Sequence, residues 1–400
     1  MFFISLPIPQ GEEEDGKCWP IPLACAAQRR KVWSMDLNDI RIPASDLAAF
    51  CAEALARAGA KESDAQSVAD HLVMANLSGH DSHGVGLLPA YLKHAAEGLV
   101  DVNAVPEVIH DKGAILKVAG HDAWGRLAGE FAMKAAFPKA DALGACVLTL
   151  TNAHHLGRIG AYGEMAAQEG FAAIFLVNVT DHDPMVAPYH GTDARFGTNP
   201  VCIALPPTGT KPAFLLDMAT SRISMGKARV AAAKGLRVPF GAILDDNGLP
   251  TDDPSGFKGF EQKGALAPFG DHKGYGLVFA AELLAGVFSG GGTGQPGNER
   301  RGGLRNQMIA LVMQPDAFGD PAAMEKEMEA MWDYALASPP ADWDSPVIAP
   351  GDPERALRKR RSAEGVPLDP ETLKQLNATA EAVGVNERLG LPPSPAKPAC

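Results

Sequence analysis

The sequence lacks the features of an extracellular, membrane-spanning or nucleic-acid-binding protein. Its six cysteines form no CxxC pair, so neither a disulfide framework nor a cysteine zinc site is indicated. No segment reaches the ~20 consecutive apolar residues that cross a bilayer. A net charge of −12, from 36 Lys+Arg against 48 Asp+Glu, argues against binding to nucleic acid, whose phosphates require clustered cations. We therefore predict a cytoplasmic protein with reduced thiols and with no membrane or nucleic-acid partner.

The rest of the composition is that of a globular protein with many loops. Hydrophobic residues make up 46% of the 400 and charged residues 21%, a balance that excludes a mostly disordered chain. Glycine (42) and proline (32) exceed their usual share but stay below the roughly 25–30% that is typical of disordered sequences. This length accommodates one large domain or two ordinary ones.

Residues 1–34 differ from the rest of the chain. Their apolar start is broken by Pro7 and Pro9, and an acidic run follows at residues 12–15. A secretory signal needs a basic start and a longer apolar stretch, so this segment does not qualify. Folded-looking sequence begins near Met35, and we predict that residues 1–34 are a disordered N-terminal extension.

Helical periodicity dominates the segment that follows. Ser45 is a predicted N-cap for an amphipathic helix that Gly59 ends. A second helix is predicted over residues 63–77, and a third follows it. These patterns predict a mainly helical domain over residues 35–150.

The middle of the chain has the pattern of β-strands. Apolar runs of strand length lie at residues 145–150, 171–179, 201–205, 213–217 and 308–313. Helices are predicted over 160–168 and 275–288. Because consecutive strands follow one another after short connections, antiparallel pairing and an α+β fold are favoured. We predict a sheet domain over residues 151–315 and a C-terminal segment over 316–400.

Residues 292–297 match the pattern GxGxxG, but their context contradicts a Rossmann dinucleotide site. Such a site needs a strand before the glycines and a helix that begins within them. Here a predicted helix precedes the glycines, and Pro296 stands among them. We predict a loop, so that a nicotinamide cofactor would have to be bound without a Rossmann motif.

Two short motifs have the residue types of a reactive site. His83, in Ser82-His83-Gly84, lies at a break between helices, where it can face a cleft and exchange a proton near neutral pH. It can equally be a half-buried histidine with satisfied hydrogen bonds. Residues 152–160 lie between a strand and a helix, where Arg158 and the helix N-terminus favour a phosphate or carboxylate. The alternative is a polar connecting loop.

Three other features allow more than one interpretation. Asp217 either orients a catalytic histidine or caps a predicted helix over 222–234. Lys273 opposes the macrodipole at a helix start, which is unfavourable unless an anion comes to it. The basic residues between Arg355 and Arg361 are predicted to form a solvated helix face. No histidine or aspartate group has zinc-ligand spacing, so no metal site is predicted.

Five segments, taken in order, resemble the malate/L-lactate dehydrogenase type 2 family of NAD(P)-dependent 2-hydroxyacid oxidoreductases. They are residues 79–91, 152–160, 187–200, 216–221 and 272–277, and the resemblance begins near Leu37. It implies a nicotinamide-binding fold unrelated to Rossmann, with a mainly antiparallel sheet and a helical domain to which the C-terminal segment returns. It also implies a homodimer with its active site between the cofactor and the helical layer.

The resemblance also implies roles for individual residues. His83 is the implied acid/base residue with Ser82 beside it, His155 is a second acid/base candidate, and Tyr91 falls on the substrate side. Under this interpretation Asp217 orients His83. The positions implied for contacts with NAD or NADP are His83, Gly157, Arg158, Ile159, Leu215, Leu216, Asp217, His272, Asn306, Pro350, Gly351 and Asp352.

One position departs from several family members, which carry an arginine four residues after the SHG histidine. Here that residue is Leu87, so the substrate carboxylate needs another cation, for which Arg158, Arg195 and Lys273 are candidates. Leu87 also indicates an apolar pocket and a bulky 2-oxo acid such as an aryl pyruvate. The alternative substrates are a cyclic imino acid, or another 2-hydroxy acid such as ureidoglycolate or sulfolactate. A cofactor-free binding protein is a third interpretation.

Overall fold

The computed structural model describes residues 40–257, 262–342, 344–385 and 388–390. These residues belong to one unit of the chain, which begins at Leu37. The predicted extension over residues 1–34 lies outside them. Within the described part, no helix combines the length and the apolar character needed to cross a membrane. The cysteines within it are buried free thiols at positions 51, 146 and 202.

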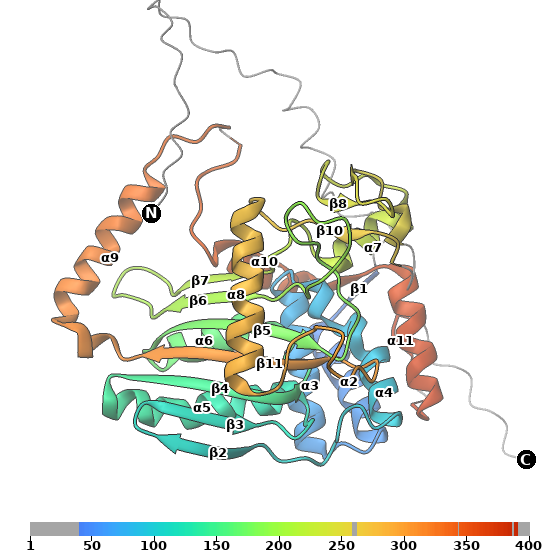
Figure 1. Ribbon diagram of the computed structural model, residues 1–400, viewed down its shortest axis with the longest axis horizontal. Coiled ribbons are helices and arrows are strands. Elements are labelled where there is room, and N and C mark those ends of the chain that lie inside the picture. Colours follow the sequence, from blue (N-terminus) through green and yellow to red (C-terminus); the bar gives the residue numbers. More distant parts are fainter. Residues whose placement is uncertain (1–39, 258–261, 343, 386–387, 391–400) are drawn as a thin grey trace, which may run out of the picture. The chain divides into compact units, whose positions relative to one another are not determined.

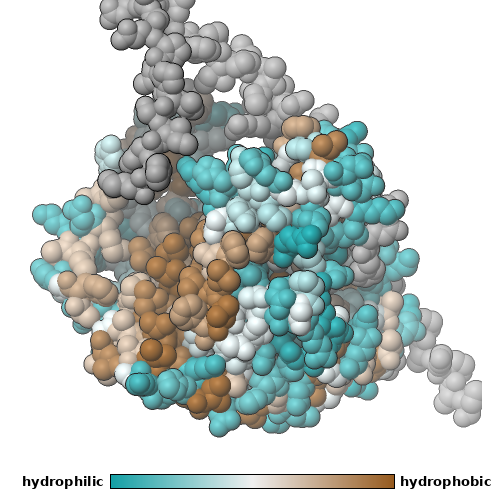
Figure 2. All heavy atoms as spheres, viewed as in Figure 1, coloured by the Kyte–Doolittle hydropathy of each residue, from teal (hydrophilic) through white to brown (hydrophobic). Residues whose placement is uncertain are grey.

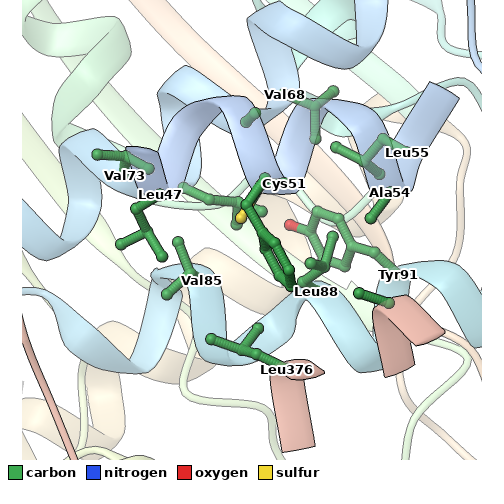
Figure 3. Close-up of a cluster of buried hydrophobic side chains, with 14 of the residues drawn as sticks. Leu47, Cys51, Ala54, Leu55, Val68, Val73, Val85, Leu88, Tyr91 and Leu376 are labelled. Atoms are coloured by element: carbon green, nitrogen blue, oxygen red, sulfur yellow. The ribbon is translucent and has the colours of Figure 1, made fainter. Parts of the chain in front are cut away.

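A helical layer joins the start of the described chain to its C-terminal part. It contains α2 (Ala44–Arg57), α3 (Glu62–Leu77), α4 (Leu88–Ala96), α10 (Asp352–Glu364) and α11 (Pro370–Ala382). Apolar side chains of α2, α3, α4 and α11 form one buried cluster, which includes Leu47, Leu88 and Leu376 (Figure 3). Strands β1 (Ile40–Ile42) and β12 (Val366–Leu368) pair antiparallel beside it.

Helix α2 begins earlier than predicted. Its N-cap is Pro43, and Ser45 lies inside the first turn with its hydroxyl bonded to Asp46. The predicted Ser45 cap is therefore wrong, because β1 leads into the helix through Pro43. The predicted end is confirmed, since Gly59 follows the C-cap with a φ of +100°, a conformation that favours glycine.

A seven-stranded sheet forms the second layer. Its order is β2 (Glu107–Lys112), β3 (Ile115–Ala119), β4 (Ala145–His154), β11 (Arg305–Met313), β5 (Ala172–Thr180), β6 (Val201–Leu205) and β7 (Phe214–Met218). Strands β3 and β4 are parallel, and the other neighbouring pairs are antiparallel. The predicted α+β fold with a mainly antiparallel sheet is confirmed.

Helices cover both faces of this sheet (Figure 1). Helices α5 (Gly125–Leu143) and α6 (Gly160–Gln168) pack on one face, and α8 (His272–Ser289) crosses the other, in front of the strands in Figure 1. Leu148, Phe175 and Met308 belong to the buried cluster of the sheet. Strand β4 ends at His154, where the chain meets α4 of the helical layer.

Smaller elements complete the described chain. Strands β8 (Ile243–Leu244), β9 (Pro250–Thr251) and β10 (Ala265–Leu266) pair antiparallel, and their cluster includes residues of α7 (Met225–Lys234) and η4 (Pro254–Phe257). The 3-10 turn η5 (Pro315–Phe318) precedes α9 (Pro321–Leu336). Helix α9 has no buried residue and contacts the β6–β7 connection, where Glu329 accepts hydrogen bonds from the hydroxyls of Thr208 and Thr210.

The glycine-rich segment at residues 292–297 is a loop, as predicted. It follows Gly290, the C-cap of α8, and contains no helix or strand. The backbone N–H of Gly294 donates to the Glu282 carboxylate of α8, which fixes this loop to the helix.

The predicted helical domain over residues 35–150 also contains strands of the large sheet. Strands β2 and β3, and most of β4, lie before residue 151 and belong to the large sheet. The division into 35–150, 151–315 and 316–400 stays a prediction about folding units.

Candidate functional site

The Ser82-His83-Gly84 (SHG) motif lies in a short 3-10 turn, η2 (Asp81–His83), which is called the SHG turn below. It is followed by η3 (Val85–Leu87). The side-chain amide of Asn76 spans this turn. Its nitrogen donates to the Asp81 carboxylate at 2.7 Å, and its oxygen accepts the Val85 N–H at 2.8 Å. A Cβ on Gly84 would collide with the same amide, so the motif requires glycine there. The turn holds His83 half-buried.

His83 faces a second histidine, which comes from the sheet layer. The rings of His83 and His155 are stacked, with centroids 5.6 Å apart and 10° between their planes. The Tyr91 hydroxyl lies 2.8 Å from Nδ1 of His155, and the Ser82 hydroxyl lies 3.2 Å from Nδ1 of His83. Both imidazoles therefore use Nδ1 within the protein, and among the described residues Nε2 of neither ring has a hydrogen-bond partner.

The neighbouring His154 points elsewhere, as expected for adjacent residues of a strand. Its Nε2 lies 2.9 Å from Nδ1 of His94, and both side chains are buried. His155 is half-buried instead. Of the two adjacent histidines, only His155 therefore faces the SHG turn.

Burial keeps the facing imidazoles neutral at pH 7. It lowers the pKa of His83 to about 4; the charge of His80 lowers this pKa too, that of Asp217 raises it, and that of Arg158 lowers it. Burial and the neighbouring imidazole of His83 hold the pKa of His155 well below its usual value. A neutral His83 can accept a proton from an alcohol.

Hydrogen bonds fix the turn after β4 from three directions. The Leu156 N–H donates to Oδ1 of Asn306 at 2.8 Å. The Leu156 carbonyl accepts from the Tyr162 hydroxyl at 2.8 Å and lies 3.0 Å from Nε2 of His71. The Asn306 amide nitrogen donates to the Asn178 carbonyl, so both groups of its amide bind backbone. A contact between Asn306 and a cofactor stays a prediction.

Arg158 is buried inside the protein at this turn. Its side chain is 1% exposed, and its Nη2 lies 2.6 Å from Glu164, which also pairs with Arg358 at 2.7 Å. Within the described residues, no guanidinium nitrogen of Arg158 has a well-directed hydrogen bond. Gly157 and Ile159 are buried as well. These three predicted cofactor contacts therefore support the turn from inside in this structure.

Asp217 caps a different helix from the one considered for it. Its Oδ2 accepts the Gly160 N–H at 2.8 Å, at the start of α6. The predicted helix over 222–234 instead begins at Met225 as α7 and is capped by Ser224, so an Asp217 cap there is wrong. Asp217 lies near enough to His83 to raise its pKa, but the two share no hydrogen bond in the described structure.

Two further segments of the predicted cofactor site, 215–217 and 350–352, meet near the turn that follows β4. Strand β7 is an edge strand, and the Leu215 N–H donates to the Pro350 carbonyl at 3.4 Å. Arg355 bonds to the Ala213 carbonyl at 2.8 Å and to Asp352 at 2.7 Å. Together with the Gly160–Asp217 bond, these contacts bring together the predicted segments 157–159, 215–217 and 350–352.

The remaining predicted residues have other surroundings. Arg195 is exposed, pairs with Asp193 at 2.6 Å and lines a cleft of about 490 Å³ beside α8. His272 and Lys273 are exposed at the start of α8, where the His272 ring lies 5.8 Å from Tyr189. Of the three candidate cations for the carboxylate, Arg158 is the one whose charge acts on His83.

The basic run of α10 is not a solvated face, so that prediction is wrong. Arg361 is 9% exposed and pairs with Asp81 at 2.7 Å, and Arg358 donates to the Ser78 hydroxyl at 2.9 Å. Lys359 and Arg360 of the same run are exposed. The reason is that one face of α10 packs against the SHG turn.

The sequence interpretation missed Asn76 altogether. A signal for it exists, because position 76 continues the apolar stripe of Val68 and Leu72 along α3 at intervals of four residues. A polar residue on such a stripe is buried and must find hydrogen-bond partners. Glu164 carries no comparable signal: Arg158 is only six residues away, but its second partner, Arg358, is distant in the chain.

Across the described residues, no group of three or more His, Cys, Asp or Glu side chains could hold an ion.

Comparison with known proteins identifies the family. A family model described as malate/L-lactate dehydrogenase matches residues 42–377. The chain belongs to this family. Members of the malate/L-lactate dehydrogenase family are oxidoreductases that act on CH–OH donors, and this protein is one of them.

Individual relatives agree with this assignment. Hydroxycarboxylate dehydrogenase B of Escherichia coli (strain K12) is 38% identical over 349 residues, which cover 87% of this chain and 95% of that protein. L-lactate dehydrogenase of Cupriavidus necator is 40% identical over 321 residues, covering 80% and 91%. The structure of malate dehydrogenase from Pyrococcus horikoshii matches with a TM-score of 0.78 at 30% identity, over 89% of this chain and 99% of that one.

Proposed function

We propose that this malate/L-lactate dehydrogenase family member transfers a hydride between NADH or NADPH and a 2-oxo acid, and that the preferred acid has a bulky or aryl side chain. The observation that carries the proposal is the stacked pair of half-buried imidazoles, His83 and His155. Each has its Nδ1 bonded within the protein, so each can turn Nε2 to one substrate oxygen.

The residues beside this pair suit a nicotinamide dinucleotide. Because β7 is an edge strand, alternate backbone groups of residues 215–217 face away from β6; the Leu215 N–H bonds to the Pro350 carbonyl, and we propose that the other outward groups bind the ligand. We propose that this strand edge, the turn 350–352, His83 and the exposed His272 bind the cofactor, with residues 157–159 and Asn306 supporting them. When bound, the nicotinamide supplies the hydride for reduction and accepts it in oxidation.

His83 is the proposed acid/base residue. In oxidation its neutral imidazole takes the hydroxyl proton at Nε2, while Ser82 bonds its Nδ1. In reduction it must first be protonated, which the charges of Asp217 and of the arriving substrate carboxylate favour. If the Tyr91 hydroxyl donates to Nδ1 of His155, Nε2 of His155 carries a proton and stabilises the developing alkoxide.

Leu87 supports a bulky substrate. It follows His83 by four residues, is half-buried and packs against the apolar cluster of the helical layer. An aliphatic side chain at that position favours an apolar substituent on the 2-oxo acid. We propose Arg158, Arg195 or Lys273 as the cation that binds the carboxylate.

Initial rates of reduction test this function. We expect turnover of phenylpyruvate, with either NADH or NADPH, to exceed that of pyruvate, 2-oxoglutarate and oxaloacetate. Arginine or lysine to methionine variants at 158, 195 and 273 identify the carboxylate partner, because losing it raises KM for the 2-oxo acid more than it lowers kcat. If cyclic imino acids are reduced and 2-oxo acids are not, the 2-oxo acid proposal is refuted and the imine alternative replaces it.

We also propose that the protein is a cytoplasmic homodimer. Along α8 the side chains of Phe279, Leu283 and Val287 follow one another every four residues and are 42%, 45% and 59% exposed. Figure 2 shows apolar side chains gathered on the face that α8 crosses. An apolar stripe of this kind favours burial against a second copy.

Measuring the molar mass in solution by light scattering tests the dimer. We expect twice the chain mass of 42.0 kDa. Val287→Asp places a charge in the stripe and should shift the protein towards the monomer. Val230→Asp, at a 50% exposed valine of α7, is the matched control and should leave the mass unchanged. A wild-type protein with the mass of one chain at micromolar concentration would contradict the proposal.

A further inference from the structure

Helix α10 turns a charged face towards the turn that carries His83. Glu354, Arg358 and Arg361 are spaced by four and three residues, so they lie on one side of the helix. Glu354 lies 3.2 Å from Nε2 of His80, and Arg358 bonds to the Ser78 hydroxyl. These contacts place α10 along the whole segment that precedes His83.

The side chain of Leu357 on α10 also packs closely against the backbone of this segment. A Cβ on Gly79 would collide with Leu357 of α10, and the φ of +83° at Gly79 also favours glycine. The backbone conformation at Gly79 and the Leu357 side chain beside it therefore both favour glycine where the chain crosses α10.

The strongest of these contacts is the ion pair of Arg361 with Asp81. Nη1 and Nη2 of Arg361 reach the two carboxylate oxygens at 2.7 and 3.0 Å, and Nη1 also donates to the Asn76 carbonyl. The guanidinium of Arg361 is almost fully buried, whereas the Asp81 side chain is 51% exposed, so the pair lies at the edge of the protein interior. A bidentate guanidinium–carboxylate pair fixes direction as well as distance.

The same pair is connected by hydrogen bonds to the residues on both sides of His83. The Asp81 carboxylate also accepts from the Asn76 amide, whose oxygen holds Val85. Within the turn, the Gly84 N–H donates to the Asp81 carbonyl and the His83 N–H to the His80 carbonyl. His83 thus lies between Asp81 and Val85. Asn76 ties both of these residues to α3, and Arg361 ties Asp81 to α10.

We propose that Arg361 is a positioning residue for His83 and acts through Asp81 and Asn76. The C-terminal helix α10 is then part of the catalytic apparatus, although it contributes no group to the proposed reaction. The kinetic part of this inference rests on the proposed function; the position of His83 itself does not.

Arg361→Met is the variant that tests the proposal. Displacing a reacting group by about 1 Å can cost on the order of 10²-fold in rate, so we expect kcat to fall by about 10- to 100-fold with KM for the cofactor little changed. Arg361→Lys keeps the charge without the bidentate geometry and should restore part of the rate. Arg360→Met makes the same change at the exposed neighbour on α10 and should behave as wild type.

Imidazole NMR resonances of His83, assigned with His83→Ala, report its position without any substrate. We expect them to shift in Arg361→Met and not in Arg360→Met. If Arg361→Met proves too unstable, Asp81→Asn removes the ion pair while keeping the side-chain shape, and the same shifts are expected. Unchanged His83 resonances together with kcat within twofold of Arg360→Met would overturn the proposal. If the wild type turns over none of the substrates, the proposed function fails and the resonances still decide this inference.

Discussion

Replacing His83 by alanine is expected to lower turnover by on the order of 10²–10⁴-fold, because the proton at the substrate oxygen then has no positioned acceptor or donor. Although His83 is one of the proposed cofactor contacts, binding of NADH or NADPH should change little, since the strand edge at 215–217, the turn at 350–352 and His272 are untouched. Single-turnover absorbance at the nicotinamide band and a fluorescence titration of the cofactor measure the two effects separately.

His110→Ala is the control for this substitution. His110 is exposed on β2, an edge strand of the large sheet, and its loss should leave turnover unchanged. Normal turnover in His83→Ala would remove His83 from the proposed mechanism and leave His155, with Tyr91 on its Nδ1, as the next candidate.

Replacing Gly125 by alanine is expected to damage both stability and activity. Gly125 is the first residue of α5, and a Cβ there would collide with the backbone carbonyls of His154 and His155. Backbone moves less readily than a flexible side chain, so we expect the free energy of unfolding to fall by about 1–3 kcal/mol. Because the displaced segment carries His155, kcat should fall as well. Urea unfolding and steady-state kinetics measure the two effects.

Gly276→Ala provides the matched control. Gly276 is also a helical glycine, in α8, but a Cβ added to it would point into open space. Alanine is favoured over glycine in a helix by up to about 1 kcal/mol, so this variant should be as stable as wild type or more stable. If Gly125→Ala behaves like Gly276→Ala, the close approach of α5 to the His154–His155 backbone is not important for the site.

Local patterns in the sequence predicted most elements of the fold. The helix over 160–168 is α6 without change, and the runs at 201–205 and 213–217 are β6 and β7 with at most one residue of difference. Their short connection required antiparallel pairing, which the sheet has. Such features depend on residues close together in the chain, where periodicity and turn length carry the information.

The candidate site could be predicted only in part, because its contacts join residues that are far apart in the chain. The pairing of His83 with His155 joins the helical layer to the sheet, and no spacing in the sequence indicates that the two rings stack. Asp217 had two plausible roles nearby, whereas the structure gives it a third, as the carboxylate at the start of α6. The basic run of α10 has the composition of a solvated surface, and its burial depends on acidic partners elsewhere in the chain.

By itself, the sequence determined the family, the α+β class and the absence of a Rossmann motif, because each follows from the order and context of local motifs. The tertiary structure alone decided which charges meet. Asp81 and Arg361 are separated by 280 positions, and nothing in either segment specifies the other. Arg361 is buried, and a buried cation is stable only where an acidic or polar partner is brought to it; the packing of α10 against the SHG turn brings the Asp81 carboxylate and the Asn76 carbonyl to its terminal nitrogens.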